Sequence, residues 1–200
     1  SIFPAKTKDF VTAVDEHSII LVKERREKET ADEIDRIAKT IEETLNAETN
    51  SRVYISSGTI VSDLKDVSRS YKEAKMALEV GKIFETDKYI VNYEKLGIGR
   101  LIYQLPLPLC RMFIKEVLHG LTMDDFDDET LATVNKFFEN NLNVSETSRQ
   151  LYIHRNTLVY RLDKLQKMTG LDLRNFDDAI IFKITLMVSK YMIYMDKMAY

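Results

Sequence analysis

Residues 143–168, NVSETSRQLYIHRNTLVYRLDKLQKM, decide the architecture of the second half of the chain. Asn143 followed three residues later by Glu146 is typical of a capping box and predicts the start of a short helix. A second helix of about thirteen residues is predicted by apolar residues recurring at four, three and three positions. These are Leu158, Leu162, Leu165 and Met168. With a tight turn at 152–154 between them, the two helices form a helix-turn-helix.

The face of the second helix opposite this apolar stripe carries polar side chains that suit a DNA major groove. Asn can bond bidentately to adenine, Arg to guanine, and Thr offers a hydroxyl and a methyl group, while Lys suits phosphates. We therefore expect the DNA-binding residues to be Arg149, His154, Arg155, Asn156, Thr157, Tyr160, Arg161 and Lys164.

Charge supports a local site. The chain has 29 Lys and Arg against 32 Asp and Glu, a net charge of -3, which excludes nucleic-acid binding through overall basicity. Residues 144–168 instead hold five basic residues and two acidic ones. The alternative is a helical hairpin whose basic face is merely solvated. The short first helix, the tight turn and the non-acidic start of the second helix favour DNA binding.

The motif also carries a family resemblance. SRQLYIHRNTLVYRLDKL at 148–165, followed by TGLDL at 169–173, is similar to the C-terminal helix-turn-helix of the purine-catabolism and carbohydrate-diacid regulators (PucR/CdaR type), itself related to the Fis type. The most specific elements are HRNT at 154–157, Arg161-Leu162 and Thr169-Gly170. The resemblance implies a transcription factor whose recognition helix begins at the Asn-Thr pair. Many related motifs have Gly in this turn, where this chain has Tyr152. Because residues other than Gly disfavour a positive φ, Tyr152 predicts a turn that avoids it.

The first half of the chain mixes strand and helix patterns. Two β-branched runs at 10–14 and 18–22 predict a hairpin of half-buried or fully buried strands. Further along we expect a helix at 30–47, a strand at 52–55 broken by 56–58, a helix at 66–84 capped by Asp66 with Tyr71, Ala74, Leu78 and Ile83 inward, and a strand at 89–93. This order predicts an α+β arrangement that ends near Leu96.

The family resemblance extends to this half, because members carry a degenerate GGDEF-like domain before the helix-turn-helix. AVDEH at 13–17 occupies the position of the GGDEF hairpin of a diguanylate cyclase. Asp15 and Glu16 are retained, whereas Ala13 and Val14 replace glycines that let the backbone approach a nucleotide. We therefore expect no cyclase activity. The resemblance also implies that the opening of this domain and an effector-binding region lie outside this chain.

Between the two halves, Gly97 and Gly99 open a helical stretch that prolines interrupt at 105–108 and that resumes at 109–118. The acidic cluster at 124–129 precedes an apolar-periodic helix and suits its N-terminus. As a metal site it lacks the Gly and distal Glu of an EF-hand. The predicted domains are a GGDEF-like domain at 1–96, connecting helices at 97–126 and an all-α helix-turn-helix domain at 127–200.

Other chemistries have little support. The three His residues lie far apart, Cys110 stands alone as a candidate buried hydrophobe, and no Walker-type loop or nucleophile elbow is present. We expect no enzyme, catalytic residue, cofactor or metal. Ser1–Phe10 lacks the pattern of a signal peptide, and the apolar stretch 179–195 contains Lys183 and Lys190, so it predicts a buried helix rather than a membrane span. From these two observations we expect the protein to be cytoplasmic.

Three functions compete: a sequence-specific regulator of a metabolic operon, a non-catalytic GGDEF-like nucleotide-sensing module, and a dimerisation module. The expected partners are double-stranded DNA and a second copy of the chain. The almost all-round apolar segment 180–195 offers a surface for the second copy, although the same residues could form only an intramolecular core.

Overall fold

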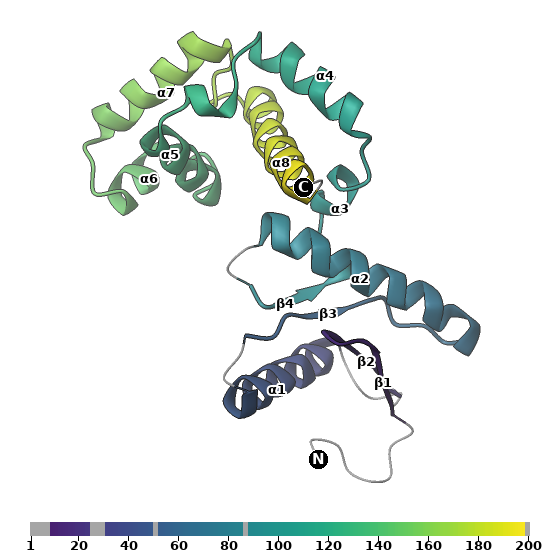
Figure 1. Cartoon of the computed structure of the whole chain (residues 1–200). Helices are drawn as coiled ribbons and strands as arrows, with labels where there is room; N and C mark the ends of the chain where they lie inside the picture. The colour runs from purple at the N-terminus through teal and green to yellow at the C-terminus, as the bar shows by residue number, and fades with distance from the viewer. Residues whose placement is uncertain (1–8, 25–30, 50–51, 86–87, 199–200) are drawn as a thin grey trace. The chain divides into compact units, whose positions relative to one another are not determined.

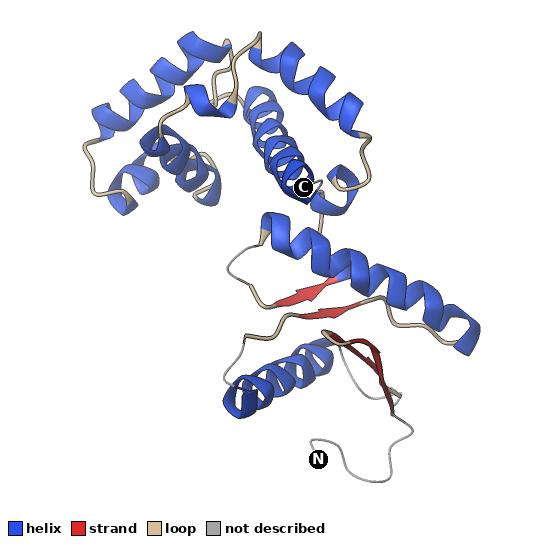
Figure 2. Cartoon of the chain, viewed as in Figure 1, coloured by secondary structure: helices blue, strands red, loops and turns tan. Residues whose placement is uncertain are grey.

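The computed structural model describes residues 9–24, 31–49, 52–85 and 88–198. The chain divides into two compact units, residues 1–100 and 101–200. Among the described residues, strands lie only in the first unit, and the second unit is helical (Figure 2). The predicted fold class, a mixed strand-and-helix region followed by a helical one, is confirmed.

The first unit contains two small sheets. Its elements are β1 (Phe10–Asp15), β2 (Ser18–Val22), α1 (Ala31–Thr49), β3 (Ile55–Ser57), α2 (Val67–Phe84) and β4 (Ile90–Asn92), with 3-10 turns at Leu64–Asp66 and Tyr93–Lys95. β1 and β2 pair antiparallel, Phe10 opposite Val22, as the predicted hairpin requires. β3 and β4 pair parallel, with Ile55 opposite Ile90. The two pairs do not join into one sheet among the described strands.

The expectation that both hairpin strands are half-buried or fully buried is wrong for β1 and for the start of β2, where Ile19 is exposed. Phe10, Val11 and Val14 are each at least half exposed. Among the described residues β1 has only β2 as a neighbouring strand, and no layer covers its outer side chains. Apolar patterning therefore predicted the strand but not what covers it.

Strand β3 begins at Ile55, where the sequence places its end. The Ile55 N–H donates to the Tyr89 carbonyl at 2.7 Å, and Ser56 and Ser57 continue the pairing with β4. Backbone hydrogen bonds do not depend on side-chain type, so the serines extend the strand. Gly58 then allows a close approach, because a Cβ there would lie 1.9 Å from the Ser70 carbonyl oxygen.

Helices α1 and α2 lie on opposite sides of the β3–β4 pair (Figure 1). The residues that α2 buries most deeply are Ala77, Val80, Gly81 and Ile83. Of the predicted inward set, only Ile83 is fully buried, and Tyr71, Ala74 and Leu78 are half-buried. Gly81 brings α2 against β4, since a Cβ would lie 2.6 Å from Cγ2 of Val91. Asp66 precedes α2, but its side chain makes no capping hydrogen bond, which corrects that expectation.

The second unit is built from helices around one core. They are α3 (Gly99–Ile102, which crosses the border in sequence), α4 (Leu107–Leu118), α5 (Asp128–Glu139), α6 (Val144–Gln150), α7 (Arg155–Thr169) and α8 (Phe176–Met198), with a 3-10 turn at Met123–Asp125. α8 lies between α4 and the group of α5, α6 and α7 (Figure 1). The fully or nearly buried cluster is Leu118, Phe126, Val134, Phe137, Leu158, Leu162, Leu165, Leu173 and Phe182. The predicted leucine stripe of α7 is thus part of the core.

Two further expectations on this unit are confirmed. The segment predicted as a buried helix lies within α8, which buries Phe182, Val188 and Tyr191; within the described ranges no helix is long and apolar enough to cross a membrane. Cys110 is 1% exposed, and burial raises the pKa of its thiol. α4 begins at 107 rather than 109 because Pro108 sits in its first turn, where a missing N–H costs nothing.

Candidate nucleic-acid interface

The two helices of the motif begin as the sequence predicts. The Asn143 side chain caps α6 by accepting a hydrogen bond from the Glu146 N–H at 3.0 Å. At the start of α7, Nδ1 of His154 accepts from the Asn156 N–H at 3.2 Å. A neutral imidazole that accepts at Nδ1 carries its proton on Nε2. His154 is exposed, and its side chain caps α7.

The turn between α6 and α7 differs from expectation. Tyr152 has φ 55°, in the left-handed region, which corrects the expectation of a turn without positive φ. The reason is the way α6 ends: the Ile153 N–H donates to the Ser148 carbonyl at 3.0 Å and the Tyr152 N–H to the Arg149 carbonyl at 3.2 Å. This Schellman motif requires a residue in the left-handed conformation, whatever its side chain. For a residue other than Gly, that conformation costs about 1–2 kcal/mol.

Four of the eight expected DNA-binding residues are exposed and unengaged. Arg155, Asn156, Thr157 and Tyr160 occupy the first two turns of α7, and Tyr160 is 69% exposed. Within the described part of the chain none of these four side chains makes a hydrogen bond or ion pair. Their donors and acceptors are available to a ligand. We call these four residues the open face of α7.

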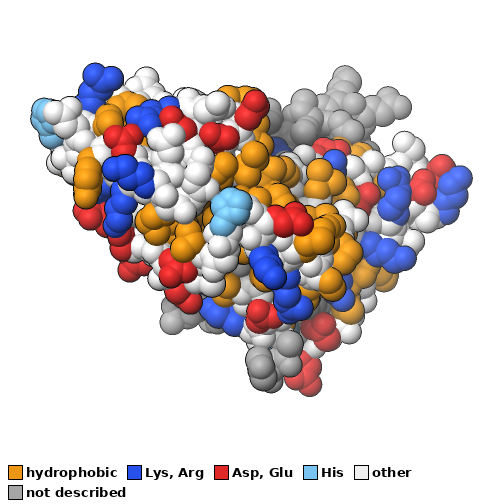
Figure 3. Space-filling view, turned by 90° about the horizontal axis from the view of Figure 1, so that it is seen from above, with side chains coloured by type: hydrophobic (Ala, Val, Ile, Leu, Met, Phe, Trp, Pro, Cys, Tyr) orange, Lys and Arg blue, Asp and Glu red, His pale blue; other side chains and the backbone are white. Residues whose placement is uncertain are grey.

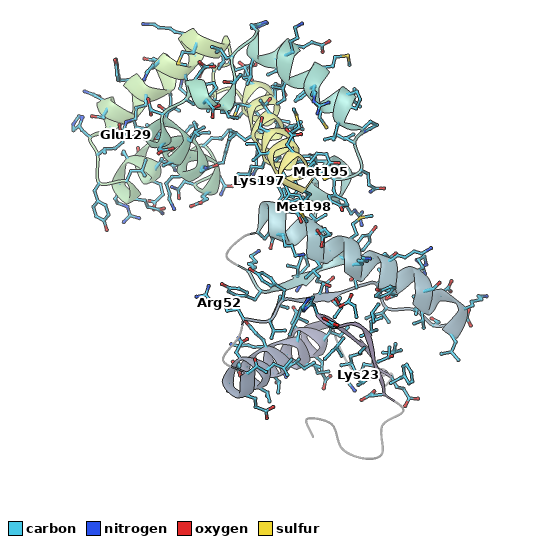
Figure 4. The ribbon with its side chains drawn as sticks, viewed as in Figure 1. Lys23, Arg52, Glu129, Met195, Lys197 and Met198 are labelled. Carbon is cyan, nitrogen blue, oxygen red and sulfur yellow. The ribbon has the colours of Figure 1, made fainter. Side chains whose placement is uncertain are left out.

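The other expected residues on α7 are held by α5. The Arg161 guanidinium donates to Oγ1 of Thr133 at 2.9 Å and pairs with Glu129, and its side chain is only 16% exposed. Nζ of Lys164 lies 3.1 Å from Oδ2 of Asp127. Figure 4 places Glu129 between α5 and α7. We call this set of contacts the α5 tether.

Asp127 serves α5 and α7 at once. Its Oδ1 accepts from the Thr130 N–H at 2.6 Å and caps α5, so the predicted capping role of the acidic cluster is confirmed. Hydrogen bonds from the side chain and backbone of Thr130, and then Lys164, lower the pKa of Asp127 to about 2. Asp125 and Thr122 form a capping box one turn earlier. The described residues contain no group of three His, Cys, Asp or Glu placed to hold a metal.

The positive surface is narrower than the sequence suggests. Arg149 is paired with Glu146 through contacts of 2.8 and 3.2 Å, and this hydrogen bonding lowers the pKa of Glu146. With Arg161 and Lys164 also paired, Arg155 and Lys167 are the basic residues of 144–168 that have no ion pair in the described structure. On the face seen in Figure 3, basic and acidic side chains are interspersed.

The hairpin of the first unit offers a second candidate site. Its tip is at Asp15, whose Oδ1 accepts from the His17 N–H at 2.8 Å, and this backbone hydrogen bond lowers the pKa of Asp15. Ala13 pairs with Ile19 in the ladder, and Val14 is half exposed. The retained carboxylate is therefore already engaged in its own turn.

Two family comparisons match these two regions. Residues 130–188 match the PucR C-terminal helix-turn-helix domain. The second half of the chain carries a PucR-type helix-turn-helix domain. Residues 2–80 match a GGDEF-like domain, so both parts of the predicted resemblance are confirmed.

Curated relatives point the same way. The chain is 28% identical over 132 residues to the purine catabolism regulatory protein of Bacillus subtilis, covering 66% of this chain and 25% of the relative. It is 31% identical over 139 residues to the carbohydrate diacid regulator of Escherichia coli, covering 70% and 36%. It is 33% identical over 132 residues to the DNA-binding transcriptional activator AdeR of Bacillus subtilis, covering 62% and 30%. The chain thus spans between a quarter and little more than a third of these relatives, which are named as regulators.

Proposed function

We propose that the chain is the DNA-binding part of a transcriptional regulator and reads a specific sequence through the open face of α7. The observation that carries this proposal is four exposed side chains without partners in the described structure, at the start of the second helix of a helix-turn-helix. Asn156 suits adenine and Arg155 suits guanine, while Thr157 can meet a thymine methyl group. His154, Arg149 and Lys164 then serve phosphates, the last two by exchanging their carboxylate partners, Glu146 and Asp127, for the DNA backbone.

Selection of duplexes from a random pool tests this proposal. The wild-type chain, without added small molecules, is expected to enrich one defined and two-fold symmetric site. A variant with Asn156→Ala and Arg155→Ala serves as the matched control, because both side chains are exposed and their loss leaves the core intact. Absence of any enriched sequence with the folded wild-type chain would refute sequence-specific binding by this region.

The regulator is proposed to act as a homodimer in the cytoplasm. Helices α4 and α8 pack on each other and expose Leu109, Met112, Ile180 and Ile193. A second copy could cover these side chains and place two α7 helices on half-sites about one helical turn apart. Light scattering of the free chain and of the complex with DNA measures this; a monomer in both would exclude the dimer.

The GGDEF-like half is proposed to be non-catalytic and to serve as a scaffold or dimerisation module. Cβ atoms at Ala13 and Val14 oppose close approach of a nucleotide, and the Asp15 carboxylate is bonded within its turn. Incubation with GTP and Mg²⁺ is expected to yield no cyclic dinucleotide. Formation of cyclic di-GMP would overturn this part of the proposal and favour an enzyme.

A further inference from the structure

Tyr152 is an unusual residue for its position. Several helix ends of the second unit reach the left-handed region, where α4 uses His119 (φ 51°), α5 uses Asn141 (φ 51°) and α7 uses Gly170 (φ 78°). Gly, Asn and His adopt this conformation more readily than other residues, and the left-handed Leu142 (φ 62°) gains burial by packing against the core cluster. Tyr152 is neither small nor packed, because it is 96% exposed.

No intramolecular contact of the Tyr152 side chain compensates for this conformation. Neither its ring nor its hydroxyl has a partner among the described residues, whereas its backbone N–H completes the end of α6. A residue in a strained backbone conformation that no packing compensates is a candidate for a functional role. The aromatic side chain is therefore more readily explained by an external partner than by stability.

The position of Tyr152 indicates which partner. It lies two residues before the α7 cap His154, so their Cα atoms are within about 7 Å. Yet it precedes α7, outside the turns that carry the open face. A side chain beside the groove-entering end of a recognition helix meets the sugar-phosphate backbone rather than base edges, and Tyr hydroxyls are among the usual phosphate donors.

We propose that Tyr152 binds the DNA backbone, its hydroxyl donating to a phosphate oxygen at the edge of the groove that α7 enters. This inference rests on the proposed function of α7. A phenol is neutral and releases no counterion, in contrast to the side chains of Arg149 or Lys164. The contact strengthens binding to any DNA sequence, and this gain offsets the cost of the left-handed backbone conformation at Tyr152.

The test compares Tyr152→Phe and Tyr152→Gly with wild type in the full chain, using the selected duplex and an unrelated duplex of equal length over a range of salt concentrations. Both variants are expected to bind about tenfold more weakly to both duplexes, with the salt slope unchanged. Tyr152→Gly is expected to unfold at the same temperature or higher. Tyr54→Phe, which removes a hydroxyl from a partly exposed tyrosine of the first unit, is the matched control and should bind like wild type.

Each outcome separates the two proposals. Wild-type affinity in Tyr152→Phe would overturn the hydroxyl contact while leaving DNA binding by α7 standing. A loss confined to the selected duplex would contradict a backbone contact, because it would indicate base readout. Failure of wild type to bind either duplex would refute the proposed function itself, and the inference with it.

Discussion

Two stretches of α7 carry similar polar side chains but have different neighbours: its first two turns, here its open end, and the stretch of Arg161 and Lys164, here its tethered end. On the first two turns Arg155, Asn156 and Tyr160 face outward without partners in the described structure. Further along, Arg161 and Lys164 are taken up by acids of α5. Residue type alone thus does not say which polar side chains of α7 remain available to a ligand. Under the proposed function, the side chains without partners read the DNA and those already bound by α5 position the helix.

Both ends of α7 rest on the same leucine stripe, so its removal should have the largest effect. Leu162 is 1% exposed within the core cluster, and Leu162→Ala is expected to cost about 2–5 kcal/mol of unfolding free energy. Urea denaturation measures the change. Ile19→Ala, at a 71% exposed position of the hairpin, is the control and should change stability by about 0.5 kcal/mol or less. A similar loss in both variants would contradict the assignment of the core.

The open end is tested by Asn156→Ala. Loss of a bidentate base contact is expected to cost about 1–3 kcal/mol in binding to the selected site and to relax preference at one base pair. Stability should stay within about 0.5 kcal/mol, since the side chain is exposed. Fluorescence anisotropy with single-base variants of the site measures this. Unchanged discrimination would remove Asn156 from the reading set.

The tethered end should behave in the opposite way. Arg161→Ala breaks hydrogen bonds to Thr133 and Glu129 and is expected to lower the unfolding free energy by about 1 kcal/mol. Affinity should fall alike for all sequences, because α7 loses support rather than a base contact. A double-mutant cycle with Glu129→Gln measures the coupling. A change in base preference without a loss of stability would return Arg161 to the guanine contact that the sequence predicts.

The smallest expected effect is on the stability of the folded chain at low pH, through Asp127. The pKa of Asp127 is about 2 in the folded chain against an ordinary 3.8, so the ionised form is favoured by folding. This contribution is present above about pH 4 and is lost as the pH falls through about 2. Asp127→Asn retains a capping oxygen but not the charge that faces Lys164, and we expect it to flatten stability against pH in this window. An unchanged acid profile, measured by circular dichroism, would show that the Asp127 carboxylate, held first by Thr130 and then by Lys164, contributes nothing there.

Local signals in the sequence predicted local structure well. The Asn143 cap, the leucine stripe of α7 and the hairpin pairing all follow from residues close together in the chain. The α5 tether could not be predicted this way, because Glu129 and Asp127 lie 32 and 37 residues before their partners. Counting charge on residues 144–168 alone therefore overestimated the free positive surface.

Two other misses have different causes. The left-handed conformation of Tyr152 does not follow from the sequence, because the hydrogen bonds that end α6 impose a positive φ even without Gly. The exposure of β1 was not predicted because an apolar strand pattern cannot say whether a layer covers it. The sequence likewise could not show that the side chains of the open face make no hydrogen bond or ion pair within the described structure.

The central claim is that DNA is read at the start of α7 and not in the GGDEF-like half. Amide chemical shifts of the isotope-labelled full chain, recorded by NMR as the selected duplex is added, test it most directly. The account predicts the largest changes at residues 152–160, smaller ones along the tethered end, and none at the hairpin of β1 and β2. Changes centred on that hairpin, with residues 152–160 unaffected, would contradict it.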